Sequence, residues 1–281
     1  MNDETDSLAS DDDTSQDRLN RLLLDHLSPI PMPQARKTGL RQGLLAHVAH
    51  SAARHAGLLT VRGKHGSWRC LTAGVKFKTL WDGPQGSSVL IEFAAGAGLI
   101  PHRHHWLEEG IVLRGGLQME ALELGPLDYH VSPPGSRHAT IKSRQGALAY
   151  LRGTSLGDQA GVLREVLGGL LPGGEDSSDS VFMESNEDWQ DLAPGVQKKV
   201  LYGDRDYQSC FYRLFAGAQL PDYSHSVDEE CMVLAGEVFF GDMLLQAGDF
   251  QLAPAGRKRG DWSCDSSALL FVRGAIVDLP G

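Results

Sequence analysis

The sequence predicts a mainly β protein in which one barrel or sandwich fold occurs twice, behind a short helical N-terminal segment. Short runs of β-branched and apolar residues, separated by Gly, Pro and Asp, fill most of the chain after residue 57. Such runs indicate the strands of a sandwich or barrel. An offset of 121 residues then matches the second half of the chain to the first, from Trp68 and Trp189 onward. Leucines at helical spacing gather before residue 58, where we expect helices.

Residues 1–57 are predicted to form a disordered acidic tail followed by two short helices. Residues 1–15 are rich in Asp, Ser and Thr, so they cannot bury enough apolar surface to fold. Three prolines at alternate positions between residues 29 and 33 impose an extended link between the helices. The second helix is expected from residue 34 or 39 to residue 56. The apolar faces consist of Leu19, Leu22, Leu23 and Leu27 in the first helix, and of Leu40, Leu44, Leu45 and Val48 in the second.

Residues 58–153 are predicted to form a first barrel, residues 154–180 a linker, and residues 181–281 a second barrel. Within the linker, residues 161–171 favour a short helix, whereas the Gly-rich and acidic residues 172–179 indicate an exposed, flexible boundary. The strands expected in the first barrel are 58–62, 75–80, 89–93, 110–113, 117–122, 127–131 and 148–152.

An internal duplication relates the two halves of the chain. The offset of 121 residues keeps its register without a gap from residue 68 to residue 153. A register of this length does not arise by chance, so the sequence predicts two copies of one domain. The matched pairs include Leu71 and Leu192, Gly74 and Gly195, Gly115 and Gly236, Asp128 and Asp249, and Arg152 and Arg273.

Two segments of the first repeat carry a set of metal-ligating side chains. His102 and His104 are two positions apart, so on an extended strand they project from the same face. Glu108 lies an even number of positions further along, and His138 follows a Pro-Pro-Gly turn that allows the chain to return. Three imidazoles and one carboxylate suit a borderline divalent ion such as Zn, Fe, Mn or Ni. We therefore predict one divalent metal ion in the first barrel.

The first repeat resembles the cupins, and among them most closely the ChrR-like cupin domains that accompany zinc-containing anti-sigma domains. The resemblance implies that each barrel is a double-stranded β-helix, or jelly roll, and that the chain is a bicupin. It also implies that the three histidines and the glutamate are the metal ligands. The residues that match are Trp68, Leu71, Gly74, Val75, His102, His104, Glu108, Glu109, Pro133, Pro134, Gly135 and His138.

The same offset predicts that the second barrel has lost its metal site. The positions equivalent to the four ligands are occupied by Tyr223, His225, Glu229 and Arg259. A guanidinium keeps its proton in a protein and cannot ligate a metal. We expect Arg259 to fill the vacated site as the ion-pair partner of Glu229, the alternative being a side chain that points to solvent. In both cases the second barrel should not bind metal as the first does.

Other histidines and one tryptophan lie near the predicted site or on the helices. His130 stands on the strand before His138 and is a candidate partner for a ligand imidazole. Trp106 either lines the mouth of the barrel or packs against it. His47 and His50 are neighbours on the second helix, where we interpret them as solvated side chains.

Composition excludes several classes of site and partner. The net charge of −10, without a dense cluster of Lys and Arg, argues against direct binding of nucleic acid. The four cysteines form no C-x-x-C pair, so neither a Cys-based zinc site nor a disulfide framework is indicated. The sequence has no secretory h-region and no apolar run of about 18 residues. We therefore expect a cytoplasmic protein that does not span a membrane.

The resemblance implies a regulatory function. ChrR-like domains act beside an anti-sigma domain in bacterial stress responses, so we expect a metal-binding sensor module with a small-molecule effector. A sigma factor or another regulatory protein is the expected partner, and zinc is the favoured ion. The chain departs from the family in its N-terminal part. Zinc anti-sigma domains carry a His-x-x-x-Cys-x-x-Cys run, whereas no cysteine precedes Cys70.

Two other functions stay open. Some cupins with similar motifs are dioxygenases that use Fe(II) to cleave β-diketones, which makes a small β-diketone-like molecule the alternative substrate. Ligation by four side chains leaves few open positions on the ion, and this favours the regulatory function. A storage-type bicupin with a vestigial ion is the third function. The sequence assigns no catalytic residue, and it allows the barrels to pair within one chain or in a homodimer.

Overall fold

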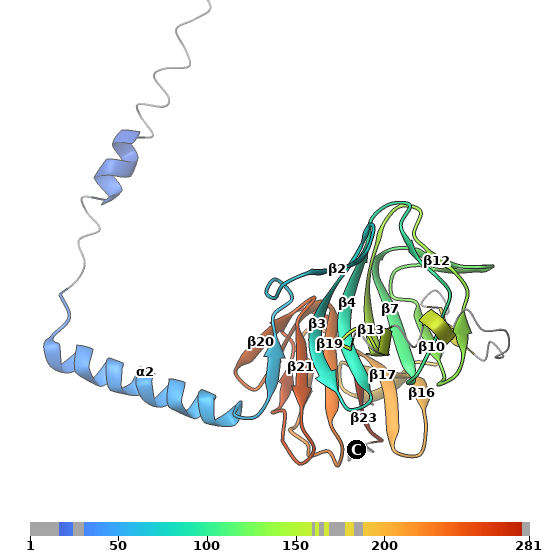
Figure 1. The fold of residues 1–281 in the computed structure, drawn as a ribbon. Coiled ribbons are helices and arrows are strands. Elements are labelled where there is room, and N and C mark those ends of the chain that lie inside the picture. Colours follow the sequence, from blue (N-terminus) through green and yellow to red (C-terminus); the bar gives the residue numbers. More distant parts are fainter. Residues whose placement is uncertain are drawn as a thin grey trace, which may run out of the picture. The chain divides into compact units, whose positions relative to one another are not determined.

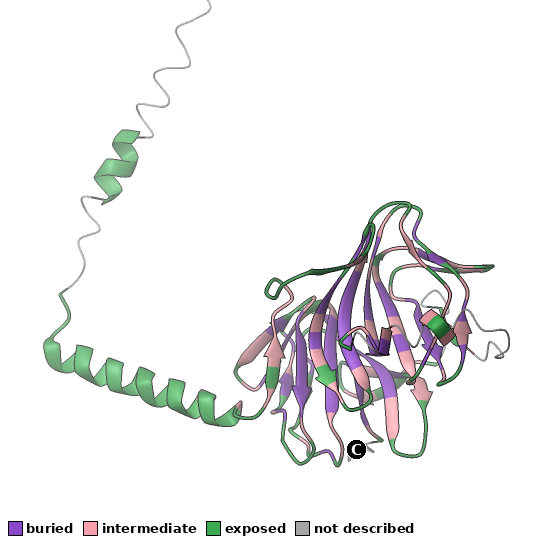
Figure 2. Ribbon diagram, viewed as in Figure 1, coloured by how far each residue is buried: buried purple, intermediate pink, exposed green. Residues whose placement is uncertain are grey.

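The computed structural model describes residues 17–24, 31–158, 161–162, 166–168, 178–182 and 188–276. The chain divides into two compact units, Met1–Arg54 and His55–Gly281. In the first unit, residues 17–24 are helical and helix α2 spans Gln34–Arg54, which confirms both predicted helices. The predicted disordered tail of residues 1–15 lies outside the described residues. None of the residues of α2 is buried (Figure 2). No helix in the described ranges combines the length and hydropathy that crossing a membrane requires.

The second unit consists of two tandem jelly-roll barrels, so the predicted mainly β fold is confirmed (Figure 1). In the first barrel, one sheet has the strand order β14-β10-β7-β13-β4-β3-β2 and a smaller one the order β5-β12-β8-β9, while β6 pairs with β11. The strands of this half are β1 (Leu59–Val61), β2 (Arg69–Thr72), β3 (Val75–Gly83), β4 (Gly86–Phe93), β5 (Gly98–Leu99), β6 (His102–Arg103), β7 (Glu108–Gly115), β8 (Leu117–Met119), β9 (Leu122–Leu124), β10 (Tyr129–Ser132), β11 (Arg137–His138), β12 (Ile141–Lys142), β13 (Ala147–Thr154) and β14 (Asp179–Val181).

The second barrel repeats this arrangement. Its main sheet has the strand order β1-β21-β19-β23-β17-β16-β15, and β18, β20 and β22 form its second face through pairs with one another and with β19. The strands of this half are β15 (Gln190–Ala193), β16 (Val196–Gly203), β17 (Tyr207–Leu214), β18 (Gln219–Leu220), β19 (Glu229–Phe240), β20 (Met243–Gln246), β21 (Phe250–Ala253), β22 (Trp262–Ser263) and β23 (Ala268–Ala275).

One predicted strand, residues 117–122, is wrong, because the structure divides it into β8 and β9. The two strands pair through Met119 and Leu122, so Glu120 and Ala121 form a two-residue hairpin loop. Glu120 has a φ of 51°, which such tight hairpin turns require. The sequence shows neither Asn nor Gly at this turn, and therefore gave no signal for it.

The barrels exchange their first strands. β1, at the start of the first repeat, pairs with β21 of the second barrel, and β14, just before the second repeat, pairs with β10 of the first barrel. The offset of 121 residues carries β1 onto β14 within one position, so the exchange is reciprocal. Asp179 belongs to this paired strand rather than to a flexible boundary, while residues 172–177 lie outside the described residues. The predicted domain boundaries at 153 and 181 stay predictions.

A shared apolar core holds the two barrels together. Each barrel has its own cluster of buried side chains, and a third cluster joins residues of the two main sheets. The shared cluster contains Leu80, Leu90, Ile111, Tyr129, Val131 and Tyr150 from the first half, and Phe211, Met232, Phe250, Leu252, Leu269 and Phe271 from the second. Burial of apolar surface on this scale is the main source of stability for such an interface.

Two equivalent ion pairs cross the shared core. Glu109 of the first barrel pairs with Arg273 of the second at 3.1 Å, and Glu230 of the second pairs with Arg152 of the first at 3.0 Å. All four side chains are buried. The offset relates one pair to the other, because 109 corresponds to 230 and 152 to 273. The duplication therefore reproduces within one chain the symmetric contacts of a two-barrel dimer.

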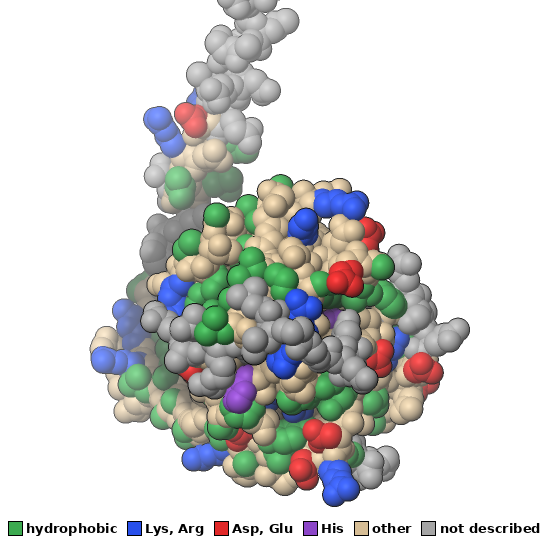
Figure 3. All heavy atoms as spheres, turned by 45° about the vertical axis from the view of Figure 1, so that its right-hand side comes forward, with side chains coloured by type: hydrophobic (Ala, Val, Ile, Leu, Met, Phe, Trp, Pro, Cys, Tyr) green, Lys and Arg blue, Asp and Glu red, His purple; other side chains and the backbone are tan. Residues whose placement is uncertain are grey.

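Charged side chains of both signs are interspersed over the face of the molecule drawn in Figure 3. Elsewhere among the exposed and part-exposed side chains, and independently of this view, Lys76 pairs with Glu92 and Lys258 pairs with Asp222. Exposed pairs of this kind contribute little stability. At a buried pair, by contrast, loss of one partner leaves an uncompensated charge.

Candidate metal centre

The structure brings three of the predicted ligands together inside the first barrel. His102 on β6 and His138 on β11 are direct partners in the strand pairing. The backbone of His104 bonds across to Gly135 and Ser136 of the Pro-Pro-Gly turn, so this turn returns the chain as the sequence suggested. One nitrogen atom from each imidazole lies within 4.8 Å of the other two. Within the described part of the chain no other group of His, Cys, Asp or Glu side chains meets this criterion, and His47 and His50 remain outside it.

Glu108 stands at the start of β7, beside this group. Its Oε2 atom lies 3.6 Å from Nδ1 of His104. Burial opposes ionisation of the carboxyl group, but the neighbouring His104, with His102 and His138 behind it, lowers the pKa of Glu108 to about 2. The side chain is therefore an ionised carboxylate, which is the form that binds a cation.

The pKa values of His102 and His138 are lowered, which favours the neutral imidazole, the form in which a histidine binds a metal. Burial lowers the pKa of His102, and burial together with the nearby His104 lowers the pKa of His138 to about 3. Nδ1 of His102 lies 3.0 Å from the carbonyl oxygen of Ile100, a contact that leaves Nε2 as the donor atom for an ion. Nδ1 of His138 is buried without a hydrogen-bond partner among the described residues. A buried nitrogen lone pair next to two more imidazoles and a carboxylate fits a divalent cation.

Side chains behind His138 hold its ring in place. Oγ of Ser132 lies 2.6 Å from Nε2 of His138, and Nε2 of His130 lies 3.1 Å from the same atom. Oγ of Ser180, on the exchanged strand β14, lies 2.7 Å from Nδ1 of His130. The predicted contact of His130 with the imidazole of His138 is confirmed. Ser180 was missed because nothing in the sequence indicated that β14 pairs with the first barrel. Ser132 was also missed, although it lies on the same strand as His130, two positions further along.

The three histidines and Glu108 lie beside an apolar cavity of about 330 Å³ in the first barrel. His102, Glu108 and His138 form part of its wall, and most of the remaining wall is aliphatic or aromatic. Trp106 is not part of this wall, and its ring contacts His105 instead, with 4.6 Å between the ring centres. The volume lies within the range of pockets that bind small molecules.

The equivalent site of the second barrel contains an ion pair. Nε of Arg259 lies 3.2 Å from Oε1 of Glu229, and the hydroxyl of Tyr223 donates to Oε2 of the same carboxylate at 2.7 Å. Arg259 is only 2% exposed and also donates to the carbonyl oxygen of Glu229. Nδ1 of His225 lies 2.7 Å from the carbonyl oxygen of Val227. The prediction that Arg259 pairs with Glu229 is confirmed, and the alternative of a solvated Arg259 is wrong.

Comparison with protein families finds the ChrR cupin-like domain twice in this chain, over residues 57–156 and 177–277. Comparison with curated protein sequences gave no match.

Several solved structures share the fold at low sequence identity. A presumed dioxygenase of Nostoc punctiforme is 14% identical, with a TM-score of 0.58 over 79% of this chain and 85% of that one. An oxalate decarboxylase of Lactobacillus farciminis is 12% identical, with a TM-score of 0.56 over 77% and 86%. The oxalate decarboxylase of Bacillus subtilis, which has Mn(II) centres, is 15% identical, with a TM-score of 0.55 over 77% of both chains. At these identities the likeness establishes the fold alone.

Proposed function

The chain belongs to the ChrR cupin-like domain family, and we propose that it is a bicupin that binds one divalent metal ion in its first barrel. We assign the ligands to His102, His104, Glu108 and His138. Zinc is the ion that we expect first, because imidazole and carboxylate donors suit it. The same donors also accept Fe, Mn or Ni. An ion held there supplies a Lewis acid that binds and polarises an oxygen atom.

The convergence of three imidazoles beside an apolar cavity carries this proposal. His104 and His138 are 3% and 6% exposed, so the donor atoms are removed from water. Depressed pKa values keep His102 and His138 free of protons that would compete with a metal,. The carboxylate of Glu108 provides one negative charge toward neutralising a divalent cation.

We further propose that the ion and the cavity together bind a small-molecule effector, so that the protein acts as a regulatory module. This function follows the family to which the two repeats belong. A sigma factor or another regulatory protein is the partner that we propose. Residues 1–57 contain no cysteine, so a contact made through this segment would not use a Cys-ligated zinc module.

The second candidate function is an Fe(II)-dependent dioxygenase with a small β-diketone-like substrate. It is favoured by the apolar cavity beside the proposed ligands, since such a pocket both binds an organic molecule and excludes water. In this function His102, His104, Glu108 and His138 would hold the ion, and the aliphatic wall would hold the carbon skeleton of the substrate.

Metal analysis of two matched variants tests the proposal. We expect about one metal ion per chain in the wild type and in His225→Ala, and none in His104→Ala, when protein purified without added metal is examined by elemental mass spectrometry. The offset makes these two histidines equivalent, so the substitutions are matched in kind. Loss of metal from His225→Ala, or protein that holds no metal in any preparation, would contradict the proposal.

Oxygen consumption separates the two candidate functions. The dioxygenase predicts that iron-loaded protein consumes oxygen when a simple β-diketone such as acetylacetone is added, and that His104→Ala does not. A regulatory module predicts binding without oxygen uptake, measured with an oxygen electrode under the same conditions.

A further inference from the structure

We propose that the ligand of the first barrel is a small amphiphile with an oxygen-rich chelating group at one end and a flexible hydrocarbon body at the other. This inference rests on the proposed function, because the metal ion fixes the chelating end. It goes beyond that function by stating which molecules the cavity selects. The apolar end would lie along the aliphatic wall, away from His102 and Glu108.

The wall of the cavity has a small ionisable part and a large apolar part, and the two lie apart from each other. Ionisable side chains occur in it only at one place, where His102, Glu108 and His138 meet the neighbouring His130, and none of the described wall residues is Lys, Arg or Asp. The apolar part of the wall includes Ile91, Phe93, Val112, Leu117, Met119 and Ile141. A ligand with a second charged group would lose its hydration there without a partner, which is costly. A hydrocarbon body is what this wall accommodates.

The second barrel shows that the fold itself does not require a cavity. At positions related by the offset of 121 residues, five residues that line the cavity are replaced by larger residues, all of them buried. These pairs are Ile91 and Tyr212, Gly110 and Cys231, Met119 and Phe240, Ile141 and Trp262, and Ala149 and Leu270.

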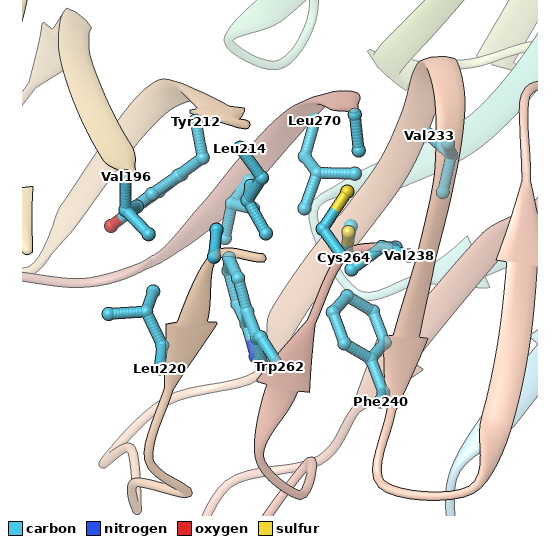
Figure 4. Close-up of a cluster of buried hydrophobic side chains, with 14 of the residues drawn as sticks. Val196, Tyr212, Leu214, Leu220, Val233, Val238, Phe240, Trp262, Cys264 and Leu270 are labelled. Carbon is cyan, nitrogen blue, oxygen red and sulfur yellow. The ribbon is translucent and has the colours of Figure 1, made fainter. Parts of the chain in front are cut away.

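The larger side chains pack together in the interior of the second barrel. Trp262 is 1% exposed, and its ring centre lies 5.4 Å from that of Tyr212 and 5.1 Å from that of Phe240. Figure 4 shows the indole between Leu220 and Phe240. The guanidinium of Arg259 lies over the ring of Phe240 at 5.0 Å. Apolar and cationic groups therefore occupy here the space that stays open in the first barrel.

Small residues keep the first barrel open. Ala149 is only 1% exposed, and a Cβ atom at Gly110 would lie 3.1 Å from Cδ2 of Leu151. An unfilled apolar cavity destabilises a protein in proportion to its volume, and the duplicated barrel shows side chains that would fill this one. We infer that Gly110 and Ala149 determine specificity by making room for the hydrocarbon body.

A series of alkyl hydroxamates tests this inference. Hydroxamates chelate metal ions through two oxygen atoms, so acetohydroxamate and hexanohydroxamate differ only in the apolar end. Hexanohydroxamate has four more methylenes, and each buried methylene strengthens binding about fourfold. We therefore expect it to bind the zinc-loaded wild type about 250-fold more tightly than acetohydroxamate, as measured by isothermal titration calorimetry. Equal affinities, or no binding of either compound to metal-loaded protein, would overturn the inference while leaving the metal site intact.

Two variants test whether the preference for the longer alkyl chain arises in the cavity of the first barrel. Ala149→Leu copies the second barrel into the first, and we expect it to abolish the preference for the longer chain while metal content and acetohydroxamate affinity stay unchanged. Leu270→Val, at the equivalent position of the second barrel, should leave the preference unchanged. A preference that survives Ala149→Leu would overturn the inference. Failure of the wild type to hold zinc would instead overturn the proposed function, because metal content is measured before each titration.

Discussion

His138 and Arg259 occupy equivalent positions of the two repeats, and each stands close to a carboxylate that is largely removed from solvent. In the first barrel His138 is neutral beside the ionised Glu108, which leaves a negative charge for a cation to balance. In the second barrel the guanidinium of Arg259 supplies that positive charge itself, at 3.2 Å from Glu229. A buried pair of this kind adds little net stability, but loss of one partner leaves an uncompensated charge.

Substitution of Arg259 should therefore be strongly destabilising. We expect Arg259→Met to lower the free energy of unfolding by about 3 to 5 kcal/mol, as measured by urea denaturation. The double variant Arg259→Met with Glu229→Leu removes both charges and should recover much of this loss. A single variant that loses less than about 1 kcal/mol, the range of an exposed pair, would contradict the account of the second site.

The four cysteines should differ sharply in reactivity. Cys70 is exposed and the other three are buried. Burial raises the pKa of Cys210 to about 12 and that of Cys231 to about 11, and the reactive form of a cysteine is the thiolate. At pH 8 we expect iodoacetamide to label one cysteine per native chain and all four in denaturant, as counted by intact-mass spectrometry. Rapid labelling of a second cysteine would contradict the packing of the second barrel.

The exchanged strand β14 contributes to the metal centre of the barrel that it joins. Ser180 contacts His130, which in turn contacts His138. Residues that orient a metal ligand typically change metal affinity 10- to 100-fold when they are removed. We expect Ser180→Ala to weaken metal binding about tenfold by this route, as measured by competition with a chelator.

The opposite exchange supplies a matched control for Ser180→Ala. Thr60, on β1, accepts a hydrogen bond from Gln251 of the second barrel at 3.1 Å, and Gln251 is the counterpart of His130. Thr60→Ala removes a similar contact from the second barrel, where Arg259 pairs with Glu229 in place of a metal site. Metal affinity should therefore not change. Equal effects of the two substitutions would indicate a general loss of stability.

The elements and the ligands were predictable from sequence to different degrees. Short runs of β-branched and apolar residues predicted β3, β4 and β13, and the spacing of His102 and His104 with the turn before His138 predicted the histidine group. The hairpin at Glu120 was missed because it lacks the usual turn residues. The pairing of β14 was missed because partners distant in sequence leave no local pattern. The cavity was not predictable, since it depends on the combined volumes of side chains from many strands.

The two barrels form one folding unit through their shared core. Six residues from each half make up this core, and two buried ion pairs and two exchanged strands cross it. Unfolding of one barrel would expose the apolar face of the other and leave buried charges without partners. We therefore expect a single cooperative urea transition, in which tryptophan fluorescence and far-ultraviolet circular dichroism coincide. Two separate transitions, one for each barrel, would contradict this expectation.

At the scale of the whole molecule, the central claim is that duplication produced one barrel for a metal ion and another in which an arginine replaces it. Titration of metal-free protein with Co(II), followed by visible absorption, tests this claim most directly. The account predicts an end point at one equivalent per chain, with the same end point in His225→Ala and no signal in His104→Ala. An end point at two equivalents, or one that His225→Ala abolishes, would contradict it.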